Sequence, residues 1–558
     1  MSYPLLALLA FATAGGAMAT AHLTGRYFLS AVGGAVIILY LHGGVYLNYT
    51  SDDAYISYRY ALHLADGMGL VWNSGQHVEG YTNFLWVMIL AATHVMGTDI
   101  VLSARWLGFG AACAAAGATY LLVDALLERK DVARYAGLAA ALTLAASGPF
   151  ALWSYAGLET SFFALLVTIA VILHIREQRG NVFPASAIAW ALVLMTRPDG
   201  MVLFGVSAFF KAAEMILAMD AGDEPRAEAP RMAPRSLAMW AGAFAMIYVP
   251  YFAWRYATYG WLLPNSYYAK VGGGMDQYER GLRYLTDFAQ QYAAWLVLLA
   301  APALLLQGLR RMASLYVIAL LAVWALYVVV VGGDGLLRFR FFAEVLPLFY
   351  ALVFASGAVI LASIHIDSGR EPLLRAAAAL AVCGGLLAFT LQSTPSEPFA
   401  VAVPLERQGV RDRVAMGRWL RAHAPPDTVI ALLAAGAIPY ESRLTTIDML
   451  GLNDEHIAHR AITVGGGTAG HEKGDAEYVL GKRPDAIILF DSLQPATAAR
   501  PQYDQLLFAL TPAAAEMVRN PLLWRGYQAR AIQIGDRWFN LLVRNDSPLL
   551  AETSAAAP

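Results

Sequence analysis

Two adjacent carboxylates, Asp52 and Asp53, open the densest polar stretch of the sequence, directly after an apolar run at about 28–47. Adjacent carboxylates repel each other, so one of them is expected to have a raised pKa or to share a cation. Either condition suits a general base or a site assisted by a divalent cation, Mg or Mn. The alternative is an acid pair that caps the N-terminus of a surface helix. The pair alone leaves both interpretations open.

Polar residues continue through this stretch and recur in four later loops. Arg59 follows the acids at helical spacing, and Glu79, Tyr81 and Asn83 come next. The later loops carry Glu159; Arg197 and Asp199; Asn265 and Lys270; and Asp334, Arg338 and Arg340. Ionisable groups near membrane depth are costly and usually mark a pathway or a site. A salt bridge, a cap or a snorkelling arginine would explain each loop singly, but five loops on one face predict a shared polar cavity.

The basic residues of these loops suit a phosphate group. Lys270, Arg338 and Arg340 could clamp it, the arginines through their planar forks, and Arg59 is a further candidate for the same role. Glycine turns with polar tips further on, among them the turn with His471 and Lys473, suit a hydroxylated ligand. The histidines lack the spacing of a zinc site, and the glycines form no nucleotide-binding fingerprint.

The composition shows which elements must position these residues. Of 558 residues, 58% are hydrophobic and only 14% are charged. Many apolar runs have about the 20 residues that a bilayer core requires, and in lipid such runs form helices. The sequence therefore predicts a polytopic α-helical membrane protein. The net charge of −2 comes with no basic patch, so a nucleic-acid partner is not expected.

Arginine and lysine in the short loops predict the orientation. Basic loops at 128–134, 176–179, 226–235, 310–311 and 370–375 are assigned to the cytoplasm by the positive-inside rule. The run 84–96 breaks this alternation and falls short of the roughly 20 residues of a span, so it is predicted to lie along the outer interface. The predicted spans number 11, or 12 with 4–21, and lie at about 28–47, 105–127, 135–153, 161–175, 183–196, 201–218, 236–256, 291–308, 313–332, 343–363 and 376–392.

The sequence divides into three parts. Residues 1–392 form the predicted transmembrane module, whose first outer loop, 48–104, carries interfacial helices. A proline-containing linker at 393–404 leads to residues 405–558, a predicted soluble α/β domain on the extracytoplasmic side. Helical spacing at 407–423 and strand-like runs at 428–433, 485–490 and 538–543 support that class.

The polar loops resemble a known family. Residues 52–61, 69–73 and 78–86 are similar to the first outer loop of the mycobacterial terminal β-(1→2)-arabinofuranosyltransferase B group. That group belongs to the GT-C class of membrane glycosyltransferases. The resemblance continues through 197–200, 264–270, Gly332-Gly-Asp334 and Arg340-Phe-Phe342, and so covers most of the chain.

The resemblance implies a sugar donor linked to polyprenyl phosphate and a glycan or glycoconjugate acceptor outside a bacterial plasma (inner) membrane. An aspartate after the first span acts on the acceptor hydroxyl in such enzymes, which gives that role to Asp52, slightly preferred, or Asp53. The resemblance implies that basic loop residues bind the donor phosphate, and Lys270 and Arg340 are the candidates for this role. Arabinofuranose is the first candidate sugar. The alternatives are a transporter or flippase and a non-catalytic receptor or scaffold. The clustering of the charged residues in loops rather than within spans disfavours a transporter or flippase.

Overall fold

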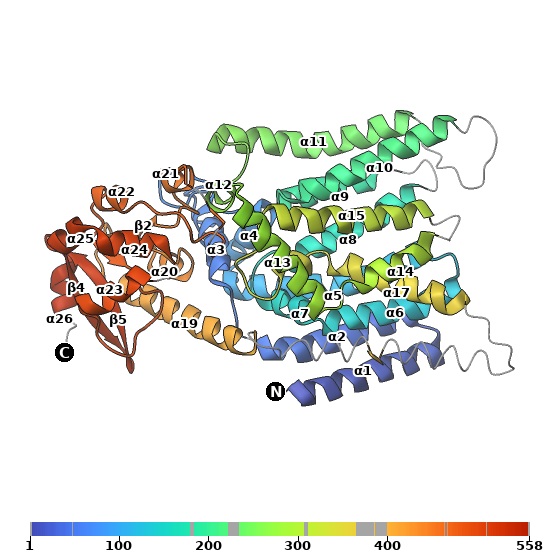
Figure 1. Ribbon diagram of the computed structural model, residues 1–558, viewed down its shortest axis with the longest axis horizontal. Coiled ribbons are helices and arrows are strands. Elements are labelled where there is room, and N and C mark those ends of the chain that lie inside the picture. Colours follow the sequence, from blue (N-terminus) through green and yellow to red (C-terminus); the bar gives the residue numbers. More distant parts are fainter. Residues whose placement is uncertain are drawn as a thin grey trace.

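The protein consists of a helical body with a compact domain at one end (Figure 1). The computed structural model describes residues 3–46, 48–178, 183–220, 234–305, 311–363, 384–385, 399–462, 464–465, 467–508 and 511–555. Within these residues, eight helices are long and apolar enough to cross a membrane: α1 (Tyr3–Thr24), α2 (Tyr27–Tyr46), α5 (Ile100–Leu126), α8 (Thr160–Glu177), α10 (Gly200–Asp220), α11 (Pro234–Tyr259), α15 (Arg311–Val330) and α17 (Leu346–Ser363).

The exposed side chains of these helices are apolar where a soluble protein would place polar ones. On α11, Met246 is 77% exposed and Val249 is 55% exposed. A continuous apolar and exposed helix surface is stable in lipid but not in water. The chain is therefore a multi-pass membrane protein.

Fewer spans are present in the described residues than the 11 or 12 predicted. The predicted span 135–153 consists of α6 (Lys130–Ala146) and α7 (Gly148–Tyr155), which meet at an angle of 63°. Pro149 lies at this junction and cannot donate a helical hydrogen bond, which explains the break. Two other predicted spans are short, α9 (Ala185–Thr196) and α14 (Leu296–Leu305). The basic loop 370–375 and all of the predicted span 376–392 except 384–385 lie outside the described residues, as do residues 226–233 and 393–398 of the predicted loop and linker. Residues 399–404 of the predicted linker belong to α19.

Five further short helices lie in the segments that connect the spans: α3 (Asp52–Ala65), α4 (Phe84–Val95), α12 (Asn265–Lys270), α13 (Met275–Gln291) and α16 (Arg340–Ala343). At 12 residues α4 is too short to span a bilayer, in agreement with its exclusion from the predicted spans. Helices α3, α4 and α12 lie at the end of the body that faces the C-terminal domain (Figure 1).

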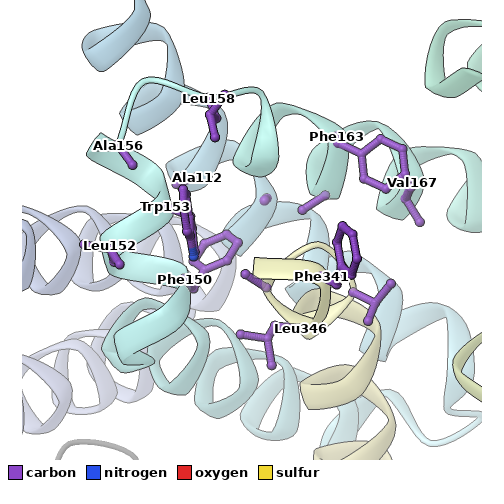
Figure 2. Close-up of a cluster of buried hydrophobic side chains, with 14 of the residues drawn as sticks. Ala112, Phe150, Leu152, Trp153, Ala156, Leu158, Phe163, Val167, Phe341 and Leu346 are labelled. Carbon is purple, nitrogen blue, oxygen red and sulfur yellow. The ribbon is translucent and has the colours of Figure 1, made fainter. Parts of the chain in front are cut away.

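Aromatic and aliphatic side chains fill the centre of the helical body. Trp153 on α7 is fully buried, and its indole Nε1 donates a hydrogen bond to the Leu337 carbonyl at 3.1 Å. Phe163 and Phe341 extend the same cluster from α8 and α16 (Figure 2). This packing holds the loop before α16 against α7, and that loop carries two of the predicted site residues, Asp334 and Arg338.

The C-terminal domain contains a five-stranded sheet of order β2-β1-β3-β5-β4. Strand β1 (Val429–Leu432) is parallel to β2 (Thr445–Asp448) and to β3 (Ala486–Ile488), whereas β5 (Arg537–Arg544) is antiparallel to β3 and to β4 (Tyr527–Ile534). This confirms the predicted α/β class. The surrounding helices are α19 (Phe399–His423), α20 (Ala437–Ser442), α21 (Glu455–Ala458), α22 (Ala476–Gly481), α23 (Arg500–Asp504), the 3₁₀ helix η1 (Gln505–Phe508), α24 (Pro512–Arg519), α25 (Pro521–Gly526) and α26 (Leu549–Ala555).

Candidate active site

A cavity of about 320 Å³ lies between the helical body and the C-terminal domain. Segments far apart in the sequence line it, from the start of α3 to Ala469 in the C-terminal domain. Among the predicted site residues, the cavity is lined by Asp53, Tyr81, Asn83, Glu159, Arg197, Asp199, Lys270, Asp334 and Arg340. The five polar loops of the sequence therefore meet at one cavity, as their common face predicted.

The two adjacent acids point to different partners. The Asp52 carboxylate accepts hydrogen bonds from the backbone N–H groups of Gly436 (3.1 Å) and Ala437 (3.0 Å), and Arg413 lies 3.7 Å away. Burial raises the pKa of Asp52, and Arg413 opposes that shift. Asp53 instead lines the cavity, and no described residue donates a hydrogen bond to its carboxylate. Asp52 therefore binds the C-terminal domain, and Asp53 is available to a ligand.

Gly436 is required by this arrangement. A Cβ atom at this position would lie 2.1 Å from the Asp52 carbonyl oxygen and 2.4 Å from its carboxylate. Real Cβ atoms do not approach so closely, so any other residue would push the domain away from α3.

Two cations line the cavity with nitrogens that no described residue engages. Arg340 donates from Nε to Asp334 Oδ2 at 2.7 Å, and its terminal nitrogens have no hydrogen bond to the described part of the chain. The Lys270 ammonium likewise has none there. A Cβ atom on Gly470 would lie 3.0 Å from Lys270 Cε, so the glycine lets the lysine stem pack closely against the domain.

Asp334 remains ionised between these cations. Burial alone would raise the pKa of its carboxyl, but Arg340, Lys270 and Arg197 together hold that pKa below its usual value. One carboxylate therefore offsets part of the positive charge of Arg340 and Lys270, and the remainder is available to an anion.

Arg197 serves the framework of the cavity. It donates to both oxygens of Asp199, at 3.0 and 2.5 Å, and to Glu159 at 2.9 Å, and it forms an ion pair with Glu344 at 3.0 Å. The carboxamide of Asn83 continues the chain by donating to Glu159 at 2.5 Å. With three carboxylates around it, Arg197 holds the start of α8, the end of α9 and the end of α16 together and has little capacity left for a ligand.

The remaining predicted residues lie elsewhere. Arg59 is 2% exposed and donates to the carbonyls of Trp72, Pro439 and Leu444, so it is a docking residue and not a phosphate ligand. Arg338 is buried with its guanidinium over the Tyr46 ring and does not line the cavity.

Four predicted ligand residues are also removed from the cavity. Glu79 binds Arg255 through both carboxylate oxygens, and Asn265 donates to the Gly451 carbonyl at 2.8 Å. These two bonds secure the segment that carries Lys270. Lys473 is buried and donates to the Ala458 and Arg460 carbonyls, whereas His471 is exposed. Burial of an ion against backbone carbonyls is a structural role, which the residue type alone did not reveal.

Several residues that complete the site were not predicted. Ser57 lines the cavity and donates to Asn83 Oδ1 at 3.0 Å, and Tyr327 lines it from the end of α15. Helical spacing from Asp53 would have found Ser57. Tyr327 lies in an apolar run, and Arg413 lies about 360 residues from the acids, so sequence spacing offered no signal for either.

The donor set for a metal ion is small. The described residues contain no group of three or more His, Cys, Asp or Glu side chains that could hold one. A Mg or Mn ion at this cavity would have Asp53 as its carboxylate ligand and would take its other ligands from water and phosphate, which suits Mg²⁺.

Comparisons with known proteins agree with this architecture. A family model described as a domain of unknown function (DUF8728) matches residues 401–541, about a quarter of the chain. ArnT from Cupriavidus metallidurans bound to undecaprenyl phosphate superposes with a TM-score of 0.55 over 94% of this chain and 98% of that chain, at 12% identity. The oligosaccharyltransferase of Archaeoglobus fulgidus gives 0.51 over 94% and 75%, also at 12% identity. The chain has the GT-C fold.

A sequence relative supports the resemblance to arabinofuranosyltransferases. The terminal β-(1→2)-arabinofuranosyltransferase of Mycobacterium tuberculosis is 26% identical over 296 residues, which cover 50% of this chain and 44% of that protein. The match thus spans less than half of the relative's length. The GT-C likeness, which covers 94% of the chain, includes both the helical body and the C-terminal domain.

Proposed function

We propose that this protein is a glycosyltransferase that moves a sugar from a polyprenyl-phosphate donor to a hydroxyl group of an extracytoplasmic glycan or glycoconjugate. The observation that carries the proposal is the cavity itself. In it Asp53, a carboxylate to which none of the described residues donates a hydrogen bond, lies with the available nitrogens of Lys270 and Arg340. The GT-C fold and the arabinofuranosyltransferase relative support it. Arabinofuranose is the first sugar to test.

The chemistry follows from these groups. Asp53 accepts the proton of the acceptor hydroxyl while that oxygen bonds to the anomeric carbon of the donor sugar. The bond between that carbon and the phosphate oxygen breaks, and its electron pair remains on the phosphate. Lys270 and Arg340 stabilise the negative charge that develops there. Holding both substrates in one cavity supplies the orientation that the reaction requires.

One side of the cavity suits the lipid part of the donor. Met201 and Val202 at the start of α10 and Val331 directly after α15 line it with apolar side chains. Both helices are membrane spans, so a polyprenyl chain could remain in the bilayer while its phosphate enters the cavity.

The direct test is release of polyprenyl phosphate. Purified protein in detergent or liposomes is incubated with a panel of polyprenyl-phosphate sugars and an oligosaccharide acceptor, with and without EDTA. We expect release of polyprenyl phosphate with at least one donor, and its loss in Asp53→Asn. Loss of release in EDTA and recovery with Mg or Mn would assign a cation to Asp53. A folded protein that turns over no donor, or an Asp53→Asn variant that does so normally, would contradict the proposal.

A further inference from the structure

A groove separate from the catalytic cavity lies where the loop before α12 meets α21. Its volume is about 640 Å³, and it is lined by Trp261, Glu455, His456, His459, Arg460 and Asp475. None of these residues takes part in the reaction proposed above. The groove therefore needs its own explanation.

The polar groups of the groove are charged or ionisable and held by one another. His456 Nε2 lies 3.0 Å from Asp475 Oδ2, and Arg460 Nε lies 3.6 Å from the same oxygen. The Trp261 indole donates to Glu455 Oε1 at 3.1 Å. Carboxylates, a guanidinium and an imidazole side by side present fixed acceptors and donors, which neighbouring hydroxyl groups can bridge.

Aromatic rings form the apolar part of the groove. The His459 ring stacks on Trp261 with centroids 3.8 Å apart and lies 4.3 Å from Tyr268. Trp261 is still 37% exposed. A partly exposed indole fixed by stacking offers a rigid apolar surface at little entropic cost, next to a row of polar groups.

The charge of the groove selects among ligands. Its one arginine, Arg460, already faces Asp475 and Glu516, so an anion such as phosphate would find no available cation there. Within the described residues no group of His, Cys, Asp and Glu has the arrangement of a metal site. A neutral ligand rich in hydroxyl groups, with an apolar ring face, fits both observations.

One segment of the chain links the groove to the cavity. Trp261 and Glu455 also line a small pocket of about 10 Å³, which Leu263 shares. Leu263 in turn lines the catalytic cavity. Tyr267 and Tyr268 repeat this division on α12, since the first lines the cavity and the second contacts His459.

We propose that this groove binds a second part of the saccharide acceptor, several sugar units from the hydroxyl that reacts at Asp53. The proposal rests on the glycosyltransferase function and adds a property to it: a long acceptor should bind better than a short one. Trp261 would stack on a sugar ring, and Glu455, His456 and Asp475 would bind its hydroxyl groups.

The kinetic test compares a long and a short arabinofuranosyl oligosaccharide as acceptors. With the long acceptor, Trp261→Ala and Glu455→Ala should each raise the acceptor KM about tenfold, equivalent to ~1.4 kcal/mol. The KM of the donor, and the KM of the short acceptor, should stay unchanged. Trp295, an exposed tryptophan on the helical body, supplies the matched control Trp295→Ala. Equal KM values for the long acceptor in all variants would overturn the proposal.

A binding measurement separates this proposal from the proposed function. The full-length protein is mixed with the long oligosaccharide without donor, and saturation-transfer NMR records contact with the sugar protons. We expect a signal that Trp261→Ala reduces, Trp261→Phe restores and Trp295→Ala leaves unchanged. This holds even if no donor is turned over. An equal signal from the wild type and Trp261→Ala, or no signal from the wild type, would contradict the proposed binding of saccharide in the groove. Neither result would test the role of Asp53.

Discussion

At the scale of single residues, the separation of Asp52 from Asp53 makes a sharp prediction. Both substitutions to asparagine keep the size of the side chain and remove its charge. Asp53→Asn should lower turnover by at least about 10²-fold, the low end for a general base. Asp52→Asn should lower it much less and should lower the melting temperature, because Arg413 loses a partner. Steady-state assays and thermal unfolding of both variants test this prediction. A larger loss of turnover in Asp52→Asn than in Asp53→Asn would identify Asp52 as the general base.

The cations of the cavity give a second prediction. Lys270→Met keeps the apolar stem but removes the charge, and Arg340→Lys keeps the charge but loses the planar fork. Both should raise the KM of the lipid donor and leave the acceptor KM nearly unchanged, since only the donor carries a phosphate. Lys482→Met, an exposed lysine of the C-terminal domain, is the matched control. A change confined to the acceptor would move Lys270 and Arg340 to the other half of the site.

The residues of the site could be predicted from the sequence, but which of them bind a ligand and which stabilise the fold could not. Nine of the predicted residues line the cavity, and seven of them are charged. Charged residues that interrupt apolar runs rarely occur without a function, which made them predictable. Which of two neighbouring aspartates is available depends on Gly436, 384 residues away, and no local pattern encodes that contact. Arg59 and Lys473 look like ligands in sequence, and only their carbonyl partners show that they stabilise the fold.

At the scale of elements, α8 and α10 share a buried ionic cluster that the sequence-based analysis overlooked. Lys211 lies 3.1 Å from Glu177 and 3.7 Å from Glu214, and His174 lies 3.2 Å from Glu214. All of these side chains are at most 8% exposed. Ionisable groups therefore do occur between spans, but they are paired with one another and form no open path for a transported ion.

This cluster predicts a large effect on stability. Lys211→Met leaves two buried carboxylates without their cation, which should cost about 3–5 kcal/mol. Lys130→Met, which breaks the exposed pair with Asp124, should cost about 0–1 kcal/mol. Thermal unfolding in detergent measures both. Equal melting temperatures for the two variants would show that the cluster does not hold α8 to α10.

Some short elements, such as helix α13 and strand β2, could not be predicted from the sequence, because each lacks a long apolar run. Helix α13 is amphipathic, so it contains no apolar run, and the predicted outer loop 257–290 was left without a helix. Strand β2 is four residues long and is stabilised by its parallel pairing with β1, a contact between distant segments. Spans are visible in a sequence because lipid demands about 20 apolar residues, whereas short elements depend on tertiary contacts.

At the scale of the whole molecule, the orientation in the membrane can be tested with cysteines. In a background with Cys113 and Cys383 replaced by alanine, Thr497→Cys places an exposed thiol on the C-terminal domain and Glu128→Cys one in the basic loop after α5. The positive-inside rule predicts that a membrane-impermeant reagent labels the first from outside and the second only in broken cells. Labelling of Glu128→Cys in intact cells would reverse the topology.

The contact of α3 with the C-terminal domain has a consequence for biogenesis. The spans can enter the bilayer as the ribosome delivers them. The partners of Asp52 and Arg59 in the C-terminal domain (Gly436, Ala437, Pro439 and Leu444) are synthesised only about 380 residues later. Until the C-terminal domain has folded against α3, Asp52 lacks two N–H donors, Arg59 lacks two of its carbonyl acceptors, and the cavity lacks one wall. Insertion and maturation are thus separate events, and the newly made protein reaches the membrane before its cavity is complete.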